Sequence, residues 1–206
     1  MVNSNAVRRR PKQARSEATV NTIYAATSQI IEREGIEKLT TNRIAEVSGF
    51  GVGTIYQYFP NRESLLVAMA IAHRDALIAE IDAVLIDSQG RSLQHAVTRM
   101  MDTLIADLRQ KKKVRQGLIR MAIRKDMFPT MQDGMRVLYD HLGKRLAEIA
   151  HREGINLSPM SQFILSRSLW GVVRAILLED SQLIDSDDME KELAGIIWTA
   201  IRREAA

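Results

Sequence analysis

The chain has 206 residues, of which 46% are apolar and 26% charged, so it can form one large or two smaller globular domains around a buried core. It contains no cysteine, which excludes disulfides and thiolate metal sites and fits a reducing, cytoplasmic compartment. No apolar run is long enough for a membrane span, and the basic N-terminus lacks the apolar segment of a secretory signal. We therefore expect a protein with no membrane contact.

The net charge of +4 is concentrated at the N-terminus. Residues 1–15 contain five basic residues and no acidic one, whereas the remainder has 24 basic and 25 acidic residues. We predict that residues 1–15 form a flexible basic arm that contacts DNA through Arg8, Arg9 and Arg10, because basic N-terminal arms can lie along phosphates or in a minor groove. A solubilising tail is the alternative.

Nearly every segment after the arm has the apolar spacing of an α-helix, and none alternates convincingly in the manner of a strand, so we predict an all-α fold. In the first half of the chain we expect a helix over residues 17–34, a short helix that follows Thr40 or Thr41 and is closed by Gly49, and helices over residues 52–59 and 62–86. Residues that commonly begin or end helices stand at their boundaries: Gly35, Thr40 or Thr41, Gly49, Pro60 and Asn61.

The second and third of these helices are short and are joined by a glycine-containing turn, behind a longer helix. This is the arrangement of a helix-turn-helix motif, in which the second short helix enters the major groove of DNA. Gly51 and Gly53 keep the start of that helix free of bulky side chains, so backbone amides can approach the DNA backbone. Ile55 and Phe59 lie four residues apart, and we expect both to face a small core.

The segment LTTNRIAEVSGFGVGTIYQYFPNRESLL, residues 39–66, resembles the DNA-binding segment of the TetR family of bacterial transcriptional repressors. The family pattern reads T-T-x-x-I-A-x-x-A-G-V-S-x-G-x-x-Y-x-Y-F-x-x-K-x-x-L, from which this chain departs at Ser48, Phe50 and Gly51. The resemblance implies phosphate or base contacts by ten residues: Thr41, Asn42, Arg43, Val52, Gly53, Thr54, Tyr56, Gln57, Tyr58 and Arg62. Arg43 and Gln57 are the candidates for reading base edges, because guanidinium and amide groups can each make paired hydrogen bonds there.

After the arm and a helix-turn-helix domain over residues 16–61, we expect residues 62–206 to form a larger helical domain for effector binding and dimerisation. Its helices are expected over residues 92–109, in a segment ending before Pro129, and over 130–153, 158–178 and about 187–206. The basic run RQKKKVR, residues 109–115, is expected to be a solvated loop or a helix start, with contact to DNA or an anionic effector as the alternative.

The last two helices are predicted to pair with their two-fold mates as a four-helix interface of a homodimer, which the resemblance also implies. The predicted interface residues are small or apolar: Ile164, Ser168, Gly171, Ala175, Leu193, Ile197 and Ile201. A monomeric core is the alternative. Two recognition helices about 34–36 Å apart, or a multiple of that distance, would read a palindrome.

An effector pocket is predicted in the larger domain, where methionines and aromatic residues that suit adaptable apolar pockets are concentrated. The candidates are Met101, Met121, Met135, Tyr139, Phe163, Trp170 and Arg174, although such residues also fill ordinary cores. Arg167 and Arg174 share a helix face with Trp170, where they hold a carboxylate ligand or form ion pairs across the dimer.

No metal-ligand spacing, nucleophile elbow, phosphate loop or dinucleotide motif is present, so we expect neither an enzyme nor a cofactor. The sequence predicts a DNA-binding regulator, acting as a repressor, that binds a double-stranded operator as a homodimer and is released by an unknown small-molecule effector. The alternative is a DNA-bound adaptor of the same fold that recruits a protein partner. A closed apolar pocket would favour the sensor, and a filled core with an exposed apolar patch would favour the adaptor.

Overall fold

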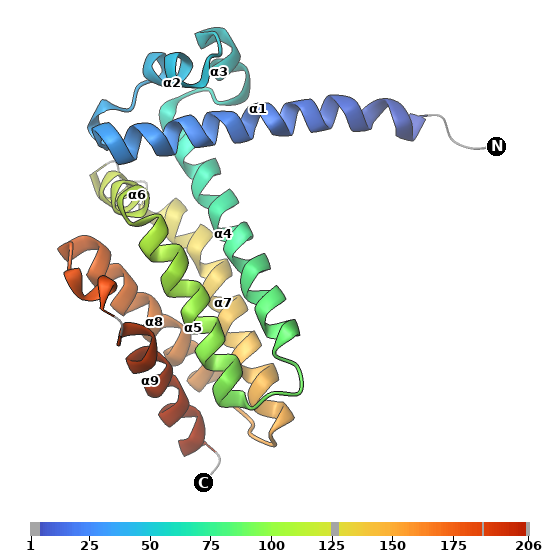
Figure 1. Ribbon diagram of the computed structural model, residues 1–206, viewed down its shortest axis with the longest axis vertical. Coiled ribbons are helices and arrows are strands. Elements are labelled where there is room, and N and C mark those ends of the chain that lie inside the picture. The colour runs from blue at the N-terminus through green and yellow to red at the C-terminus, as the bar shows by residue number, and fades with distance from the viewer. Residues whose placement is uncertain (1–4, 125–127, 187, 205–206) are drawn as a thin grey trace. The chain divides into compact units, whose positions relative to one another are not determined.

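The computed structural model describes residues 5–124, 128–186 and 188–204, which contain helices and no strand, as the all-α prediction requires (Figure 1). The chain divides into two compact units, residues 1–69 and residues 70–206, and each is described separately. The elements are α1 (Asn5–Glu34), η1 (Ile36–Lys38), α2 (Thr41–Ser48), α3 (Val52–Tyr58), α4 (Arg62–Asp87), α5 (Leu93–Gln110), α6 (Lys112–Arg124), α7 (Phe128–Arg152), α8 (Pro159–Glu179), η2 (Gln182–Asp185) and α9 (Met189–Arg203).

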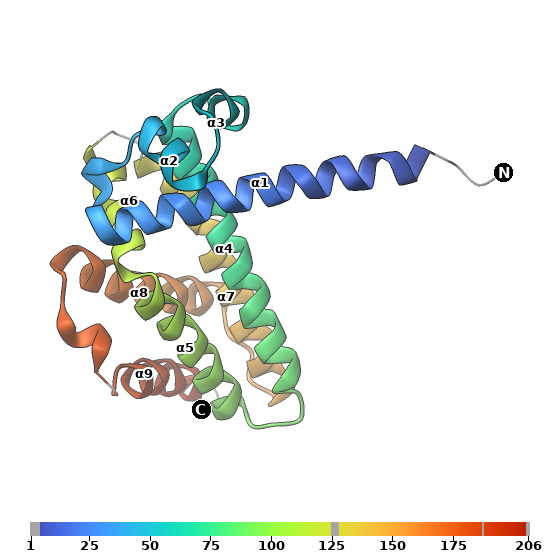
Figure 2. The ribbon, with the colours of Figure 1, turned by 45° about the horizontal axis from the view of Figure 1, so that its top comes forward.

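In the first unit, α2 packs on α1 and α3 packs on α2 (Figure 2). The two short helices begin and end where their sequence predicts. The Thr40 side chain caps α2 by accepting a hydrogen bond from the Arg43 amide at 3.1 Å. Gly49 ends α2 in the left-handed conformation, with φ of 73°, which favours glycine.

The end of α3 and the start of α4 also follow the prediction. Phe59 is extended before Pro60, and the Asn61 side chain caps α4 by accepting a hydrogen bond from the Ser64 amide at 2.8 Å. Ile55 and Phe59 are buried, as expected, with the α1 residues Ile23 and Ile30. A small apolar core therefore holds α3 on the unit.

The N-terminal arm differs from its prediction, because α1 already begins at Asn5 rather than near Glu17. Alanine, arginine, lysine and glutamine, which have high helix propensity, dominate residues 6–15. They extend a helix whose C-terminal half is anchored by the core of the unit. The helix includes Pro11 within its first turns.

The two compact units divide within α4, between Met69 and Ala70, later than the boundary we predicted at Arg62. The physical reason is that Leu65, Leu66 and Met69 are fully buried in the first unit, so the first turns of α4 complete its core. The rest of the helix belongs to the second unit.

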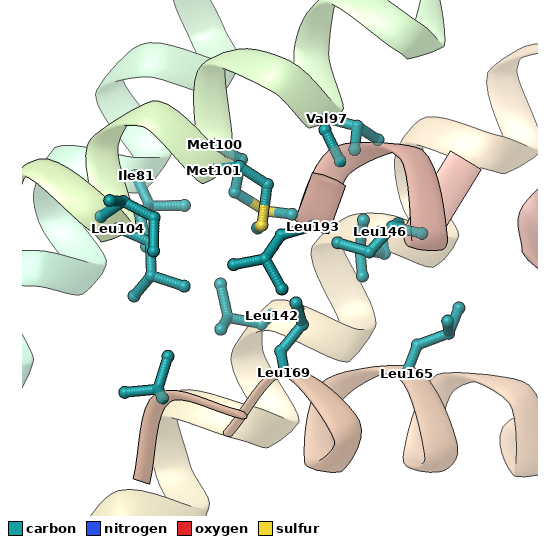
Figure 3. Close-up of a cluster of buried hydrophobic side chains, with 14 of the residues drawn as sticks. Ile81, Val97, Met100, Met101, Leu104, Leu142, Leu146, Leu165, Leu169 and Leu193 are labelled. Carbon is teal, nitrogen blue, oxygen red and sulfur yellow. The ribbon is translucent and has the colours of Figure 1, made fainter. Parts of the chain in front are cut away.

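In the second unit, α5 packs against both α9 and α7, and α8 packs against α7 and α6. One continuous core of buried apolar side chains joins these helices (Figure 3). Ser158 caps α8 by accepting a hydrogen bond from the Ser161 amide at 3.1 Å, with Pro159 in the first turn. The last helix, expected from about residue 187, begins after Asp188, and residue 187 lies outside the described residues.

The basic run of residues 109–115 does form a helix start, at Lys112, but it is not the solvated segment that we expected. Arg109 donates hydrogen bonds to the Ile184 carbonyl at 2.6 Å and the Ser186 carbonyl at 2.7 Å, and forms an ion pair with Glu190. Lys111 binds Asp107 at 2.7 Å. Side chains of the run therefore stabilise the second unit itself.

None of the described helices has an apolar window that would let it cross a membrane.

Candidate nucleic-acid interface and effector cavity

The predicted DNA-contacting residues lie on α2, α3 and the start of α4, and none of the ten is buried. Asn42, Gly53, Tyr56 and Gln57 are exposed to solvent, and the side chain of Tyr56 keeps about half of its surface, 51%, accessible. The other six are partly exposed: Thr41, Arg43, Val52, Thr54, Tyr58 and Arg62. The helix-turn-helix thus presents a polar surface above a closed apolar core.

Two of these residues connect the short helices to each other. The hydroxyls of Thr41 on α2 and Tyr56 on α3 lie 3.2 Å apart and form a hydrogen bond. This bond fixes the start of α2 against the outer side of α3. Both groups retain hydrogen-bonding capacity for a phosphate, because each hydroxyl can donate once and accept twice.

Arg43, a predicted reader of base edges, is held by two carboxylates. Its guanidinium lies 2.7 Å from Glu34 and 2.7 Å from Glu46, and its hydrogen bond to Glu34 lowers the pKa of that carboxyl group. Arg62 is engaged as well, since it donates to the Leu39 carbonyl at 3.0 Å. Of the two candidates for base edges, Gln57 is the exposed one, and Arg43 reaches DNA only by exchanging its present partners.

Gly51 and Gly53 stand at the start of α3 with no neighbouring atom within 4 Å of the position that a Cβ atom would occupy. Neither glycine has a positive φ. The packing and backbone of the unit therefore do not require glycine at either position. The open space faces outward, as our prediction of close approach to DNA needs. The side chains of Arg8, Arg9 and Arg10 lie outside the described part of α1.

The second unit contains a small cavity lined by α4, α5, α6, α7 and α8. The cavity has a volume of about 20 Å³, enough for about one water molecule. Its wall is mainly apolar and includes Leu104, Met135, Leu142, Leu169, Trp170 and Val173. Of the residues predicted for the effector pocket, Met135, Tyr139 and Trp170 line this cavity.

The other predicted pocket residues lie elsewhere. Met101 is fully buried in the core, Met121 is buried without lining the cavity, and Phe163 is exposed on α8 with 55% of its surface accessible. Arg174 is half-buried and is not part of the lining. Residue type and helical spacing place these side chains in the right domain but do not say which of them face a common space.

Two polar groups in the cavity wall have no hydrogen-bond partner among the described residues, the Tyr139 hydroxyl and the Arg115 Nε. Tyr139 is 6% exposed, and burial raises its pKa, so the hydroxyl stays neutral and can donate. Arg115 was missed by our sequence analysis because it stands in the basic run, where its spacing resembles that of a solvated charge. Only its position beside the buried Asp107 distinguishes it.

A roomier hollow of about 300 Å³ lies at the α4–α5 turn, lined by Arg91, Arg152 and Glu153 among others. Its Glu153 carboxylate already accepts a hydrogen bond from the Leu93 amide. None of the buried side-chain polar atoms that lack a partner, among the described residues, belongs to this wall. The smaller cavity is therefore the better candidate for an effector site, despite its volume.

On α8 the residues of the predicted dimer face are open to solvent and their pairing stays a prediction, whereas on α9 the predicted residues are buried within their own chain, which corrects that part of it. Ile164, Ser168 and Gly171 of α8 are exposed and Ala175 is half-buried, together with exposed Met160, Phe163 and Val172. Leu193, Ile197 and Ile201 of α9 are buried in the core of their own chain, and Figure 3 shows Leu193 pointing toward Leu142 and Leu169. The apolar stripe of α9 thus packs on α5, and its exposed large apolar residue is Ile196.

Arg167 also finds its partner within the chain. It binds Asp140 at 2.6 Å, and its guanidinium stacks 4.5 Å from the ring centroid of Phe163. The predicted alternatives, an ion pair across the dimer and a ligand carboxylate, are therefore not needed to explain this charge.

Comparison with known proteins gives a consistent result for the first unit. The sequence profile of the family described as bacterial regulatory proteins, tetR family, matches residues 23–69. An uncharacterized HTH-type transcriptional regulator of Haemophilus influenzae is 38% identical over 48 residues, which is 23% of this chain. The match spans about a quarter of that relative, 26% of its length.

Solved structures resemble nearly the whole chain in fold. The fatty acid degradation regulator FadR from Bacillus halodurans superposes with a TM-score of 0.64 at 14% identity, covering 90% of this chain and 93% of that one. The multidrug binding protein EbrR, complexed with imidazole, superposes with a TM-score of 0.62 at 18% identity, covering 88% and 93%. At these identities the likeness establishes the fold alone.

Proposed function

This chain belongs to the TetR family of bacterial helix-turn-helix regulators, and from that premise we propose that it binds a palindromic operator as a homodimer and represses transcription until a small-molecule effector releases it. The observation that carries the DNA-binding part is the polar surface of α2 and α3. Asn42, Tyr56 and Gln57 stand exposed on a core that fixes them. Amide groups such as those of Asn42 and Gln57 suit paired hydrogen bonds to base edges.

The glycine-bearing start of α3 supports the same proposal. Gly51 and Gly53 are open to solvent and are not required by the packing of the unit. A surface that must accept a DNA backbone gives a reason for their small size. The basic arm carries a net positive charge, which the remainder of the chain does not, and we assign the arm to phosphate contacts that are independent of sequence.

The exposed face of α8 supports a homodimer. Met160, Phe163, Ile164 and Val172 keep between 39% and 67% of their surface accessible, and exposed small residues lie among them. At Gly171 there is open space around the position of a Cβ atom, which leaves room for close approach of a partner helix. We propose that α8 and its two-fold mate form the centre of the interface, with Ile196 of α9 at its side.

The small cavity of the second unit favours an effector-sensing regulator over a protein-recruiting adaptor. An adaptor has no need for unpaired polar groups in a mainly apolar cavity wall, and the wall of this small, partly open cavity carries two. Leu77 of α4 lines it, and the same helix begins in the DNA-binding unit. Ligand binding would therefore favour one arrangement of α4 over another, a population shift that reduces operator affinity.

The test is selection of random double-stranded DNA by the purified full-length protein near physiological salt, followed by sequencing. We expect enrichment of an inverted repeat, and deletion of residues 1–15 should weaken binding to every sequence without changing the repeat. Sedimentation should give a dimer of the 23.3 kDa chain. Binding without an enriched sequence would contradict the regulator, and a monomer at micromolar concentration would contradict the dimer.

A further inference from the structure

We propose that the cavity of the second unit binds a small, mainly apolar organic acid, whose carboxylate is held by the Tyr139 hydroxyl and the Arg115 Nε. The inference rests on the proposed effector response and specifies the chemical class of the effector. It is drawn from the unpaired polar groups, the charge and the shape of this cavity.

The apolar part of the ligand follows from the cavity wall. Six of its twelve lining residues are leucines, from α4, α5, α7 and α8, and Val173 and the flexible thioether of Met135 add to the apolar surface. The ring of Trp170 lies 5.1 Å from that of Tyr139, measured between centroids, and closes one side. Such a wall favours an aliphatic or aromatic body over a sugar or a peptide.

The polar part follows from two unpaired donors. The Tyr139 hydroxyl is buried, neutral and without a partner among the described residues. The Arg115 guanidinium is anchored through its Nη2, which donates to Asp107, and this leaves the Nε without a partner. Both groups line the same cavity, so one ligand oxygen or two oxygens of one carboxylate can satisfy them.

The charge of the ligand follows from an imbalance around Asp107. This carboxylate is 5% exposed and pairs with both Arg115 and Lys111, so two cations share one anion. The nearby His73 adds no charge near neutral pH, because burial, followed by the fields of Lys111 and Arg115, lowers its pKa. One negative charge from a ligand would balance the cluster, whereas a neutral amide or alcohol would not.

The size of the ligand is limited by the space present. A cavity with room for about one water molecule must enlarge to take any organic acid, and each displaced side chain opposes this. Small acids with a narrow body therefore fit the cavity better than polycyclic ones. We choose octanoate as the probe, because its chain is flexible and its uncharged analogue octanamide has nearly the same shape.

The experiment measures octanoate and octanamide binding to the full-length protein by calorimetry, without DNA, and melting temperatures by thermal denaturation. We expect octanoate to bind at least about ten-fold more tightly than octanamide, the difference that a hydrogen-bonded charge makes. Tyr139→Phe should weaken octanoate by about ten-fold. The same substitution should raise the melting temperature of the free protein, since it removes a buried hydroxyl that has no partner. Tyr24→Phe, which removes a hydroxyl in the first unit, is the matched control and should leave octanoate binding unchanged.

Three results would overturn the inference: no octanoate binding, equal binding of the amide, or a Tyr139→Phe protein that melts lower and binds octanoate normally. The proposed function fails separately. An enriched inverted repeat without octanoate binding leaves the DNA-binding regulator standing and refutes only the organic acid. Octanoate binding that leaves operator affinity unchanged supports the site and refutes effector release.

Discussion

The two units of this protein differ in where their available hydrogen-bonding groups lie, on the surface in the first unit and in the interior in the second. In the first unit the exposed polar groups and the open space lie on the surface, at Asn42, Gln57 and the start of α3 around Gly53. In the second unit they lie inside, where the Tyr139 hydroxyl and the Arg115 Nε line a small, partly open cavity. The difference teaches that the first unit suits a partner larger than itself, and the second a ligand smaller than one of its own helices.

The exposed apolar face of α8 fits neither description, because it suits a second copy of the chain. Disrupting this face should have the largest effect. Ile164→Glu places a charge on the exposed apolar face of α8, where a partner copy would have to bury it. We expect a monomer in sedimentation and a loss of operator affinity of at least about 100-fold, because the second half-site no longer binds intramolecularly.

Ile86→Glu is the matched control for that prediction, since Ile86 is exposed to a similar degree at the end of α4. Its sedimentation and DNA binding should be those of the unchanged protein. A dimer that survives Ile164→Glu would show that another surface holds the two copies together.

The outward face of the first unit is tested by Gly53→Ala. Nothing in the unit contacts an added methyl group there, and alanine stabilises a helix by about 0.5–1 kcal/mol relative to glycine. We expect a higher melting temperature together with a loss of operator affinity of about ten-fold, because the methyl group displaces a backbone–phosphate contact. Fluorescence anisotropy with a labelled operator and thermal denaturation measure the two effects, and unchanged DNA affinity would contradict our reading of this glycine.

The buried charge cluster around Asp107 in the second unit is tested by the pH dependence of stability. Burial, followed by the positive charges of Lys111 and Arg115, lowers the pKa of His73, and the negative charge of Asp107 opposes this shift. The Nδ1 of His73 has no partner among the described residues. The imidazole of His73 takes up a proton near pH 6.5 in the unfolded chain, and only at lower pH in the folded protein. Stability should therefore fall as the pH drops through about 6.5 and level off below the folded pKa.

The effect of His73 should be less than about 1 kcal/mol after allowance for its partial exposure. Melting temperatures between pH 7.5 and 5.5 should fall less in His73→Gln than in the unchanged protein. Identical pH profiles would mean that His73 is solvated and charged in the fold, contrary to our description of the Asp107 cluster.

The smallest effect is expected at Arg43. Glu34→Gln removes one of the two carboxylates that hold its guanidinium, and should raise operator affinity about two- to five-fold, the scale of one exposed ion pair. The melting temperature should change little. If the ion pairs instead hold Arg43 in the position that binds DNA, the Glu34→Gln protein would bind the operator more weakly in a titration.

Local features such as helix caps were predicted correctly from the sequence, whereas tertiary packing was not. Thr40, Asn61 and Ser158 cap helices through their own neighbours, so their roles can be predicted from a few residues. The apolar stripe of α9 was assigned to the wrong surface, because Leu193 and Ile197 have the same spacing whether they face a partner or their own core. Arg115 could not be identified at all, since its role depends on a carboxylate eight residues away and on a cavity formed by five helices.

The contacts of Arg109 have a consequence for how the sequence of this protein can change. Arg109 binds the segment between α8 and α9 through two backbone carbonyls, at Ile184 and Ser186, and pairs with the Glu190 side chain in the first turn of α9. Backbone carbonyls are present whatever residues occupy those positions. The segment can therefore accept substitutions at its exposed positions, such as Leu183, as long as Arg109 and Glu190 are kept and its length does not change.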